Sequence, residues 1–98
     1  MADEVYQNNI YTDTPFISVR KVLAEMGAPY STNVELVSMH STSKGRLGEC
    51  GLRGGYMETV NLDGFVEKML YKLKSIELCS NTIGQLATYL MTTPPKKG

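Results

Sequence analysis

Apolar residues occur in short blocks along the chain, separated by polar and glycine-rich stretches. Residues 34–40 are mostly apolar, which predicts a largely buried strand, and residues 56–62 have the composition of a second strand. The opening residues, Asp3 to Tyr6, resemble the end of a further strand whose apolar part is missing. The polar residues 7–13 that follow predict a loop.

Three later segments carry apolar residues at helical spacing. We expect the first helix to begin with Thr14 as its N-cap and Pro15 in its first turn, and to end at Gly27 and Pro29. Its apolar face is formed by Val19, Val22, Leu23 and Met26. Such a face predicts packing against the sheet.

The second helix is predicted to follow Asp63 as its N-cap, and the third to begin at Ser80 or Asn81. Their expected core-facing residues are Phe65, Val66, Met69, Leu70 and Leu73, and then Ile83, Leu86, Ala87, Leu90 and Met91. Residues 92–98, with two prolines and two lysines, predict a flexible tail.

The predicted order is strand end, helix, strand, glycine-rich loop, strand, helix and helix. Strands that alternate with helices favour an α/β fold. A length of 98 residues suits a single domain, residues 1–98, with one modest core.

The composition of the chain indicates which binding partners and which cellular compartment to expect. Ten basic and ten acidic residues balance, so nothing indicates a nucleic acid or an anionic membrane as a partner. No apolar run approaches the roughly 20 residues of a membrane span, and the acidic start at Asp3 and Glu4 is unlike a secretory signal. Cys50 and Cys79 predict neither a disulfide framework nor a metal site. We therefore expect a reduced, cytoplasmic setting.

Lys44 lies in the most chemically dense part of the chain, after the hydroxyl-rich residues 41–43 and before Gly45. Most lysines are solvated surface groups, and this remains the simple alternative. A lysine at the end of a buried strand can, however, be partly desolvated, and its neutral amine can form a Schiff base with an aldehyde. Lys44 is therefore a candidate for covalent catalysis.

Arg53 lies among glycines 48, 51, 54 and 55. Glycines allow the backbone to approach a ligand closely, and the planar guanidinium group suits phosphate. The hydroxyls of Ser41 and Ser43 could donate to the same anion. A flexible surface loop with a solvated arginine is equally compatible with this composition.

Asp3 and Tyr6 end the first expected strand, at the edge where α/β sheets usually bind ligands. A buried carboxylate there could keep a ring nitrogen protonated, although composition alone favours an acidic terminus without a ligand. We expect His40 to be a hydrogen-bonded residue at a strand end, and Cys50 and Cys79 to be small packing residues or inert thiols.

Three blocks of residues combine these candidates. They are Ala2-Asp3-Glu4-Val5-Tyr6-Gln7, His40-Ser41-Thr42-Ser43-Lys44-Gly45 and Gly48-Glu49-Cys50-Gly51-Leu52-Arg53-Gly54-Gly55-Tyr56. Together they resemble alanine aminotransferases, of the fold type I class of pyridoxal 5′-phosphate enzymes. The similarity continues from Lys21 to Gln85 and covers nearly the whole chain, and although Ser-x-Ser-Lys alone is a weak signal, the combination is specific.

The resemblance implies a role for each matching residue. Lys44 would form the Schiff base with the cofactor aldehyde and move the proton during catalysis. Asp3 would pair with the pyridinium nitrogen, and Tyr6 would hydrogen-bond the ring's phenolic oxygen. The phosphate would be bound by Ser41, Arg53 and, as a helper, Ser43.

The resemblance also implies a longer, homodimeric parent enzyme. This chain would be a fragment of its cofactor-binding large domain, which has a mixed, mostly parallel sheet and flanking helices. The parent reaction would convert L-alanine and 2-oxoglutarate to pyruvate and L-glutamate. Because the family takes its substrate-clamping arginine and ring-stacking aromatic residue from sequence outside these 98 residues, we expect the isolated chain to be inactive.

Two departures bear on the subfamily. Arg46 stands where these relatives usually have a tyrosine, and Asn81-Thr82 stands where they have Pro-Val or similar residues. Neither departure falls on one of the proposed cofactor-binding residues. Another fold type I aminotransferase, acting on aromatic amino acids or glyoxylate, therefore remains an alternative, as does a non-catalytic module.

Overall fold

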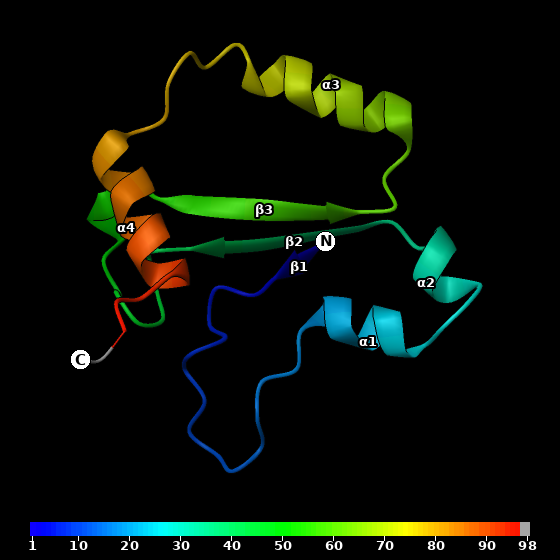
Figure 1. Cartoon of the computed structure of the whole chain (residues 1–98), viewed down its shortest axis with the longest axis horizontal. Coiled ribbons are helices and arrows are strands. Elements are labelled where there is room, and N and C mark those ends of the chain that lie inside the picture. The colour runs from blue at the N-terminus through cyan, green and yellow to red at the C-terminus, as the bar shows by residue number, and fades with distance from the viewer. Residues whose placement is uncertain (97–98) are drawn as a thin grey trace.

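The computed structural model describes residues 1–96 and contains a three-stranded sheet with helices around it (Figure 1). The strands are β1 (Ala2–Asp3), β2 (Leu36–Ser41) and β3 (Gly55–Val60), in the order β1-β2-β3. β1 is parallel to β2, whereas β3 is antiparallel to it. The α/β class and the mixed sheet are thus confirmed, but the expected majority of parallel pairs is not seen in this sheet.

The three predicted helices are present, together with two elements that were not predicted. The helices are α1 (Val19–Glu25), α2 (Tyr30–Asn33), α3 (Gly64–Lys74) and α4 (Thr82–Thr92), and the remaining element is the 3₁₀ turn η1 (Cys50–Leu52). Neither α2 nor η1 is long enough to produce a periodic apolar pattern, which explains why both were missed. No described helix is long and apolar enough to cross a membrane.

The starts of α3 and α4 follow their predicted caps. The Asp63 side chain accepts hydrogen bonds from the backbone N–H groups of Phe65, at 2.9 Å, and Val66, at 3.3 Å. The Asn81 side chain accepts one from the N–H of Ile83 at 3.0 Å. Both contacts are local, so the sequence around each helix start contains the necessary information.

The predicted start of α1 at Thr14 is wrong. The N-cap is Ser18, whose hydroxyl accepts a hydrogen bond from the N–H of Lys21 at 3.1 Å. The N–H of Val19 donates to the carboxylate of Glu4 at 2.8 Å, across 15 positions of sequence. This distant carboxylate satisfies an N–H group of the first turn, which a reading of local residues could not anticipate.

Both longer strands are shifted from their predicted limits. α2 occupies the chain up to Asn33, so β2 begins at Leu36 and continues to Ser41. β3 ends at Val60 because Asn61 adopts a left-handed backbone conformation, with φ of 55°. The Asn61 side chain donates to the carbonyl of Val34 at 3.2 Å, which ties this end of β3 to the start of β2.

A small apolar core holds α1 against the sheet. It consists of the buried side chains of Ala2, Leu23 and Leu36, with Val60 packed against them. α1 is also connected to β3 by an ion pair between Arg20 and Glu58.

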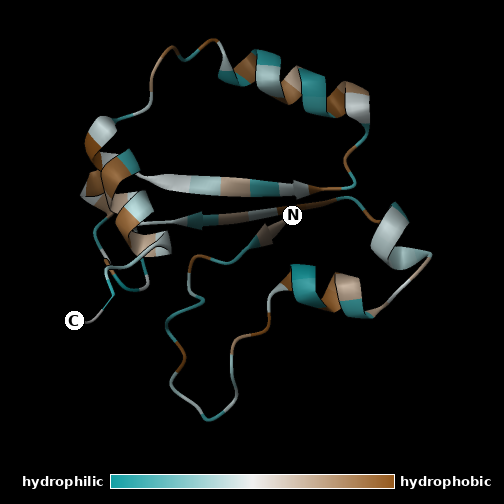
Figure 2. Ribbon diagram, viewed as in Figure 1, coloured by the Kyte–Doolittle hydropathy of each residue, from teal (hydrophilic) through white to brown (hydrophobic). Residues whose placement is uncertain are grey.

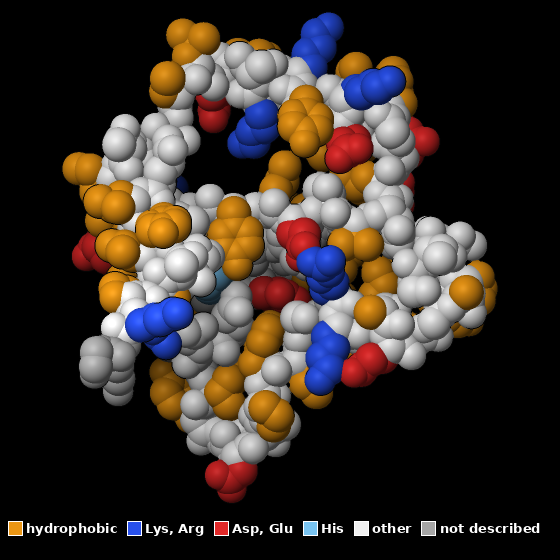
Figure 3. Space-filling view, in the orientation of Figure 1, with side chains coloured by type: hydrophobic (Ala, Val, Ile, Leu, Met, Phe, Trp, Pro, Cys, Tyr) orange, Lys and Arg blue, Asp and Glu red, His pale blue; other side chains and the backbone are white. Residues whose placement is uncertain are grey.

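Most of the predicted apolar stripes of α3 and α4 remain exposed. No residue of α3 is buried, and in α4 only Gly84 and Ala87 are. Apolar residues therefore lie on the outside of both helices (Figures 2 and 3). The radius of gyration is 15.6 Å, against about 13 Å for a compact chain of this length. A sheet with one two-residue strand and two of six residues offers too little apolar surface to cover these stripes.

The C-terminal end differs slightly from the predicted tail. Thr92 is the last residue of α4 rather than the first of the tail, and residues 94–96 have no regular structure. The final two residues of the predicted tail, 97 and 98, lie outside the described residues.

Candidate functional site

An open cleft of about 330 Å³ lies at the carboxyl ends of β1 and β2. It is lined by Asp3, Val5, Met39, His40, Ser41, Ser43 and Lys44. Because the two strands are parallel, both carboxyl ends meet at one edge of the sheet, where α/β proteins usually bind ligands. The structure therefore brings four of the six predicted site residues to one cleft.

The strand register explains why Asp3 and Ser41 share this cleft. Asp3 of β1 lies opposite Met39 of β2. Side chains alternate between the faces of a sheet, so Asp3, Met39 and Ser41 point to the same side. The alternate residues of β2, Leu36 and Ser38, are buried on the opposite face.

Lys44 lies in the tight turn that follows β2, and two distant contacts fix this turn. Thr42 is fully buried, and its N–H and hydroxyl both donate to the carbonyl of Gly54, at 3.0 and 3.2 Å. The N–H of Gly45 donates to the side chain of Asn9 at 3.1 Å, with Gly45 at φ of 68°. Lys44 is thus an exposed side chain on an anchored backbone.

Tyr6 lies beside Lys44, with the lysine Nζ 6.0 Å from the centre of the tyrosine ring. This distance is at the outer limit for a cation–π contact. Tyr6 is not at a strand end as predicted, because β1 ends at Asp3 and the chain turns over residues 5–8. The Asp3 carboxylate accepts a hydrogen bond from the N–H of Val5 at 3.2 Å, which stabilises that turn.

The cleft offers several kinds of chemical group to a ligand. Lys44 supplies an amine, Asp3 a carboxylate, and Ser41 and Ser43 supply hydroxyls, while Tyr6 adds a phenol at the rim. Among the described residues neither Asp3 nor Lys44 takes part in an ion pair. Pyridoxal 5′-phosphate presents an aldehyde, a pyridine nitrogen and a phosphate, and this set of groups fits all three.

Arg53 lies outside this cleft. It lines a neighbouring pocket of about 210 Å³ with Gly54, Gly55, Ser80, Asn81, Gln85 and Thr88. Its guanidinium Nη1 donates to the carbonyl of Cys50 at 3.1 Å, which folds the side chain back over η1. The residue after Arg53 is Gly54, and its carbonyl accepts the hydrogen bonds of Thr42. The Arg53 pocket is therefore connected to the Lys44 cleft through Gly54 and Thr42.

One prediction about a neighbouring side chain is wrong. His40 was expected to be hydrogen-bonded, yet its buried Nδ1 has no partner among the described residues. Its ring instead meets the ring of Tyr56 edge-on, with centres 5.9 Å apart. Cys50 and Cys79 are exposed free thiols, which excludes the packing alternative and leaves the prediction of inert thiols.

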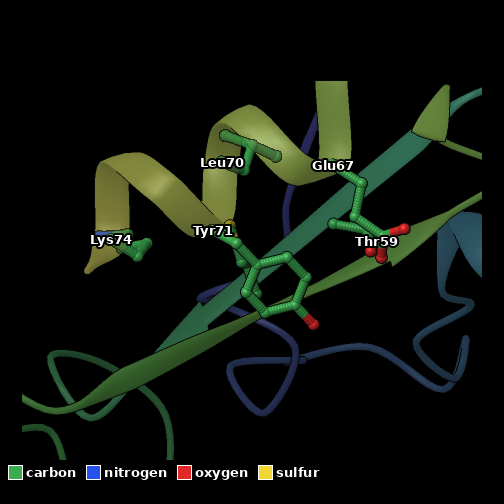
Figure 4. Close-up of a pocket in the computed structure, with 6 residues that line it drawn as sticks. Thr59, Glu67, Leu70, Tyr71 and Lys74 are labelled. Atoms are coloured by element: carbon green, nitrogen blue, oxygen red, sulfur yellow. The ribbon is translucent and has the colours of Figure 1, made fainter. Parts of the chain in front are cut away.

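A further hollow, of about 250 Å³, lies between α3 and β3 (Figure 4). It is lined by Met57, Thr59, Glu67, Leu70, Tyr71 and Lys74. It contains none of the predicted site residues and has a mainly apolar wall. Within residues 1–96 no group of three or more His, Cys, Asp or Glu side chains could hold a metal ion.

Thr42 and Asn9 are functional candidates that the sequence did not reveal. Both act through long-range hydrogen bonds, Thr42 to Gly54 and Asn9 to Gly45. Thr42 lies in one of the three blocks that carry the family resemblance, but the resemblance implies no role for it. Asn9 lies in a polar loop without a motif. Nothing in the local sequence distinguishes them from ordinary polar residues.

Comparison with known proteins identifies relatives along the whole chain, although no family model matches it. Alanine aminotransferase 1 from Rattus norvegicus is 54% identical over 96 residues, which are 97% of this chain and 19% of the relative. Alanine aminotransferase 2 from Xenopus tropicalis is 54% identical over 99 aligned residues, covering all of this chain and 19% of the relative.

Glutamate–glyoxylate aminotransferase 1 from Arabidopsis thaliana is also 54% identical over 99 aligned residues, which are 21% of that protein. The chain thus spans about a fifth of the length of these relatives. Identity at this level over the whole chain supports common descent, and the three candidate blocks lie within the matched region. The chain is therefore similar to one segment of these longer alanine and glutamate–glyoxylate aminotransferases.

Proposed function

We propose that this chain carries the cofactor-binding lysine segment of a pyridoxal 5′-phosphate-dependent aminotransferase of fold type I. The parent reaction would be the conversion of L-alanine and 2-oxoglutarate to pyruvate and L-glutamate. The observation that carries the proposal is the cleft that unites Asp3, Ser41 and Lys44 at the carboxyl ends of two parallel strands. The names of the relatives support it independently.

Each residue of the cleft has a distinct task in this proposal. When bound, pyridoxal 5′-phosphate supplies an electron sink for the substrate carbon that loses a proton. Lys44 would hold the cofactor through its amine, and the same amine would accept the proton of the substrate carbon. The Asp3 carboxylate would keep a proton on the pyridine nitrogen by a charge-assisted hydrogen bond. The Tyr6 hydroxyl would donate to the ring's phenolic oxygen, and its place beside Lys44 supports this role.

The phosphate would lie between the two pockets. Ser41 and Ser43 would donate from the Lys44 cleft, and Arg53 would reach from the neighbouring pocket. For this the Arg53 side chain must leave the carbonyl of Cys50, a hydrogen bond of 3.1 Å at the exposed surface. The carbonyl of Cys50 is a neutral acceptor, whereas the phosphate is a dianion. The guanidinium should prefer the phosphate, because hydrogen bonds between two charged groups are stronger than those to a neutral acceptor.

Glutamate–glyoxylate transamination is the second candidate. The Arabidopsis relative with that name is as similar to this chain as the two alanine aminotransferases are. The similarity of this chain therefore does not favour one of the two activities over the other. The residues of this chain therefore support the cofactor chemistry more strongly than a particular amino-acid substrate.

We infer a cytoplasmic setting and a homodimeric parent enzyme. Both cysteines are free thiols, which suits a reducing compartment. The balanced charge gives no basis for a nucleic-acid or membrane partner. The dimer follows from the resemblance to fold type I enzymes.

Reductive labelling tests the proposal directly. The chain is incubated with pyridoxal 5′-phosphate and treated with borohydride, and the labelled lysine is identified by peptide mapping. We expect the pyridoxyl group on Lys44, because among the lysines that the structure describes only this amine shares a cleft with Asp3 and two serines.

Lys44→Arg provides the matched control, since it keeps the charge and removes the nucleophilic amine. This variant should lose most of the label. Equal labelling of Lys68, Lys72, Lys96 and Lys97 in both proteins would contradict an organised site.

A further inference from the structure

The backbone at Arg53 adopts a conformation that its own residue type disfavours. Its φ and ψ are 51° and 43°, in the left-handed region. For a residue with a side chain this conformation is costly, and it persists where surrounding contacts hold it. The contacts on either side of Arg53 are therefore informative.

Asn81 makes one of these contacts. Its Nδ2 donates to the carbonyl of Leu52, the residue before Arg53, at 3.0 Å. Its other side-chain atom, Oδ1, accepts from the N–H of Ile83 at 3.0 Å and so caps α4. One amide group thus joins the start of α4 to the backbone of the η1 turn.

A close approach of two glycines makes the second contact. A Cβ atom on Gly84 of α4 would lie 2.6 Å from the carbonyl oxygen of Leu52 and 2.7 Å from that of Arg53. A Cβ on Gly54 would lie 2.3 Å from the carbonyl oxygen of Gly84. The backbones are in direct contact, so a displacement of α4 would displace Arg53.

The same turn is attached to the Lys44 cleft. The carbonyl of Gly54 accepts both hydrogen bonds of Thr42, two residues before Lys44. Asn81, Arg53, Gly54 and Thr42 therefore form one continuous set of contacts from α4 to the cofactor cleft.

We propose that Asn81 is a positioning residue, which holds the backbone of Arg53 in its left-handed conformation, so that the guanidinium reaches the cofactor phosphate once it leaves the carbonyl of Cys50. This inference rests on the proposed function, because it assumes that Arg53 binds phosphate. Asn81 also stands at one of the two positions where the sequence departs from the family resemblance. The family that this chain resembles has Pro-Val or similar residues at positions 81 and 82. Proline has no side-chain donor, so it could not make the hydrogen bond to Leu52.

The test compares the binding of pyridoxal 5′-phosphate and pyridoxal, which differ only in the phosphate. Their dissociation constants are measured by equilibrium dialysis for the full 98-residue chain and for Asn81→Ser. Serine keeps the helix cap but is too short to bridge to Leu52. We expect Asn81→Ser to bind pyridoxal 5′-phosphate about three- to tenfold more weakly, the range expected for one net hydrogen bond, and pyridoxal equally well.

Two further variants serve as controls. One tests whether any loss of a side-chain hydrogen bond weakens phosphate binding, and the other tests whether Arg53 binds the phosphate. Asn61→Ser removes the two side-chain hydrogen bonds to the carbonyls of Ser31 and Val34 at the far end of β3, and it should leave the preference for the phosphorylated ligand unchanged. Arg53→Gln should abolish most of that preference. An unchanged preference in Asn81→Ser, with a loss in Arg53→Gln, would overturn the positioning role alone. An unchanged preference in Arg53→Gln, or no binding by the unaltered chain, would overturn the phosphate assignment and the positioning role together.

Discussion

Thr42 shows how one residue connects the two halves of the candidate site. Its N–H and its hydroxyl both donate to the carbonyl of Gly54, and its side chain has no exposed surface. The candidates with recognisable chemistry, Lys44 and Arg53, could be proposed from the sequence because motifs surround them. Thr42 could not, because its importance depends on a partner 12 positions away, which no local pattern encodes.

Replacing Thr42 by valine tests this contribution. Valine keeps the shape of threonine and the backbone bond but removes the hydroxyl and its bond to Gly54. We expect the free energy of unfolding to fall by about 1 kcal/mol, measured by urea denaturation. Reductive labelling of Lys44 should also fall, since the turn that holds it loosens.

Thr14→Val serves as the control for Thr42→Val. Thr14 is exposed and lies in a segment without regular structure. Its replacement should change the free energy of unfolding by less than about 0.5 kcal/mol. An equal effect of the two substitutions would show that the bond to Gly54 contributes nothing.

At the scale of elements, α3 and α4 were predicted well and α1 less well. Asp63 and Asn81 cap their helices through contacts within three residues, so the local sequence was sufficient. The start of α1 depends on Glu4, which lies far away in sequence. The contact between α4 and the η1 turn was also unpredictable, because a glycine inside a helix ordinarily indicates only a weak helix former.

Gly84→Ala is expected to destabilise the protein, against the usual order of helix propensities. In an unobstructed helix alanine is better than glycine by up to about 1 kcal/mol. At position 84 the added methyl group would overlap the carbonyl oxygens of Leu52 and Arg53, and such overpacking costs about 1–3 kcal/mol. Urea denaturation followed by circular dichroism measures the net effect.

Gly64→Ala is the matched substitution in α3. Nothing lies within 4 Å of a Cβ atom added there, so the helix propensity should prevail and stability should rise slightly. If both substitutions stabilised the chain, the tight contact between α4 and the η1 turn would be refuted.

At the scale of the whole molecule, the cleft is assembled but much apolar surface is left uncovered. The α/β class followed from the alternation of strands and helices, which is a property of the sequence. The amount of buried surface did not follow, because a stripe such as that of α3 indicates which side of a helix is apolar and not whether a partner is present. Arg53 in a separate pocket was equally unforeseen, since the spacing of residues along a loop does not fix the path of its backbone.

We expect the isolated chain to show no measurable transamination of alanine and 2-oxoglutarate. It holds candidate cofactor contacts, but the substrate-clamping arginine implied by the resemblance is not among its residues. Pyruvate release, followed by coupling to lactate dehydrogenase, measures the rate, with the same chain bearing Lys44→Arg as the background. A rate near the enzyme median of about 10 s⁻¹ would contradict this prediction.

The position of β3 at the end of the sheet has a practical consequence for handling the protein. One edge of β3 pairs with β2, and no described strand pairs with the other. Its six residues include no proline and a single charge, Glu58, which is already paired with Arg20. An edge with these properties is a template for strands of other molecules. Concentrated solutions of the chain should therefore form intermolecular sheets along β3, and dilution should be the first means of keeping it monomeric.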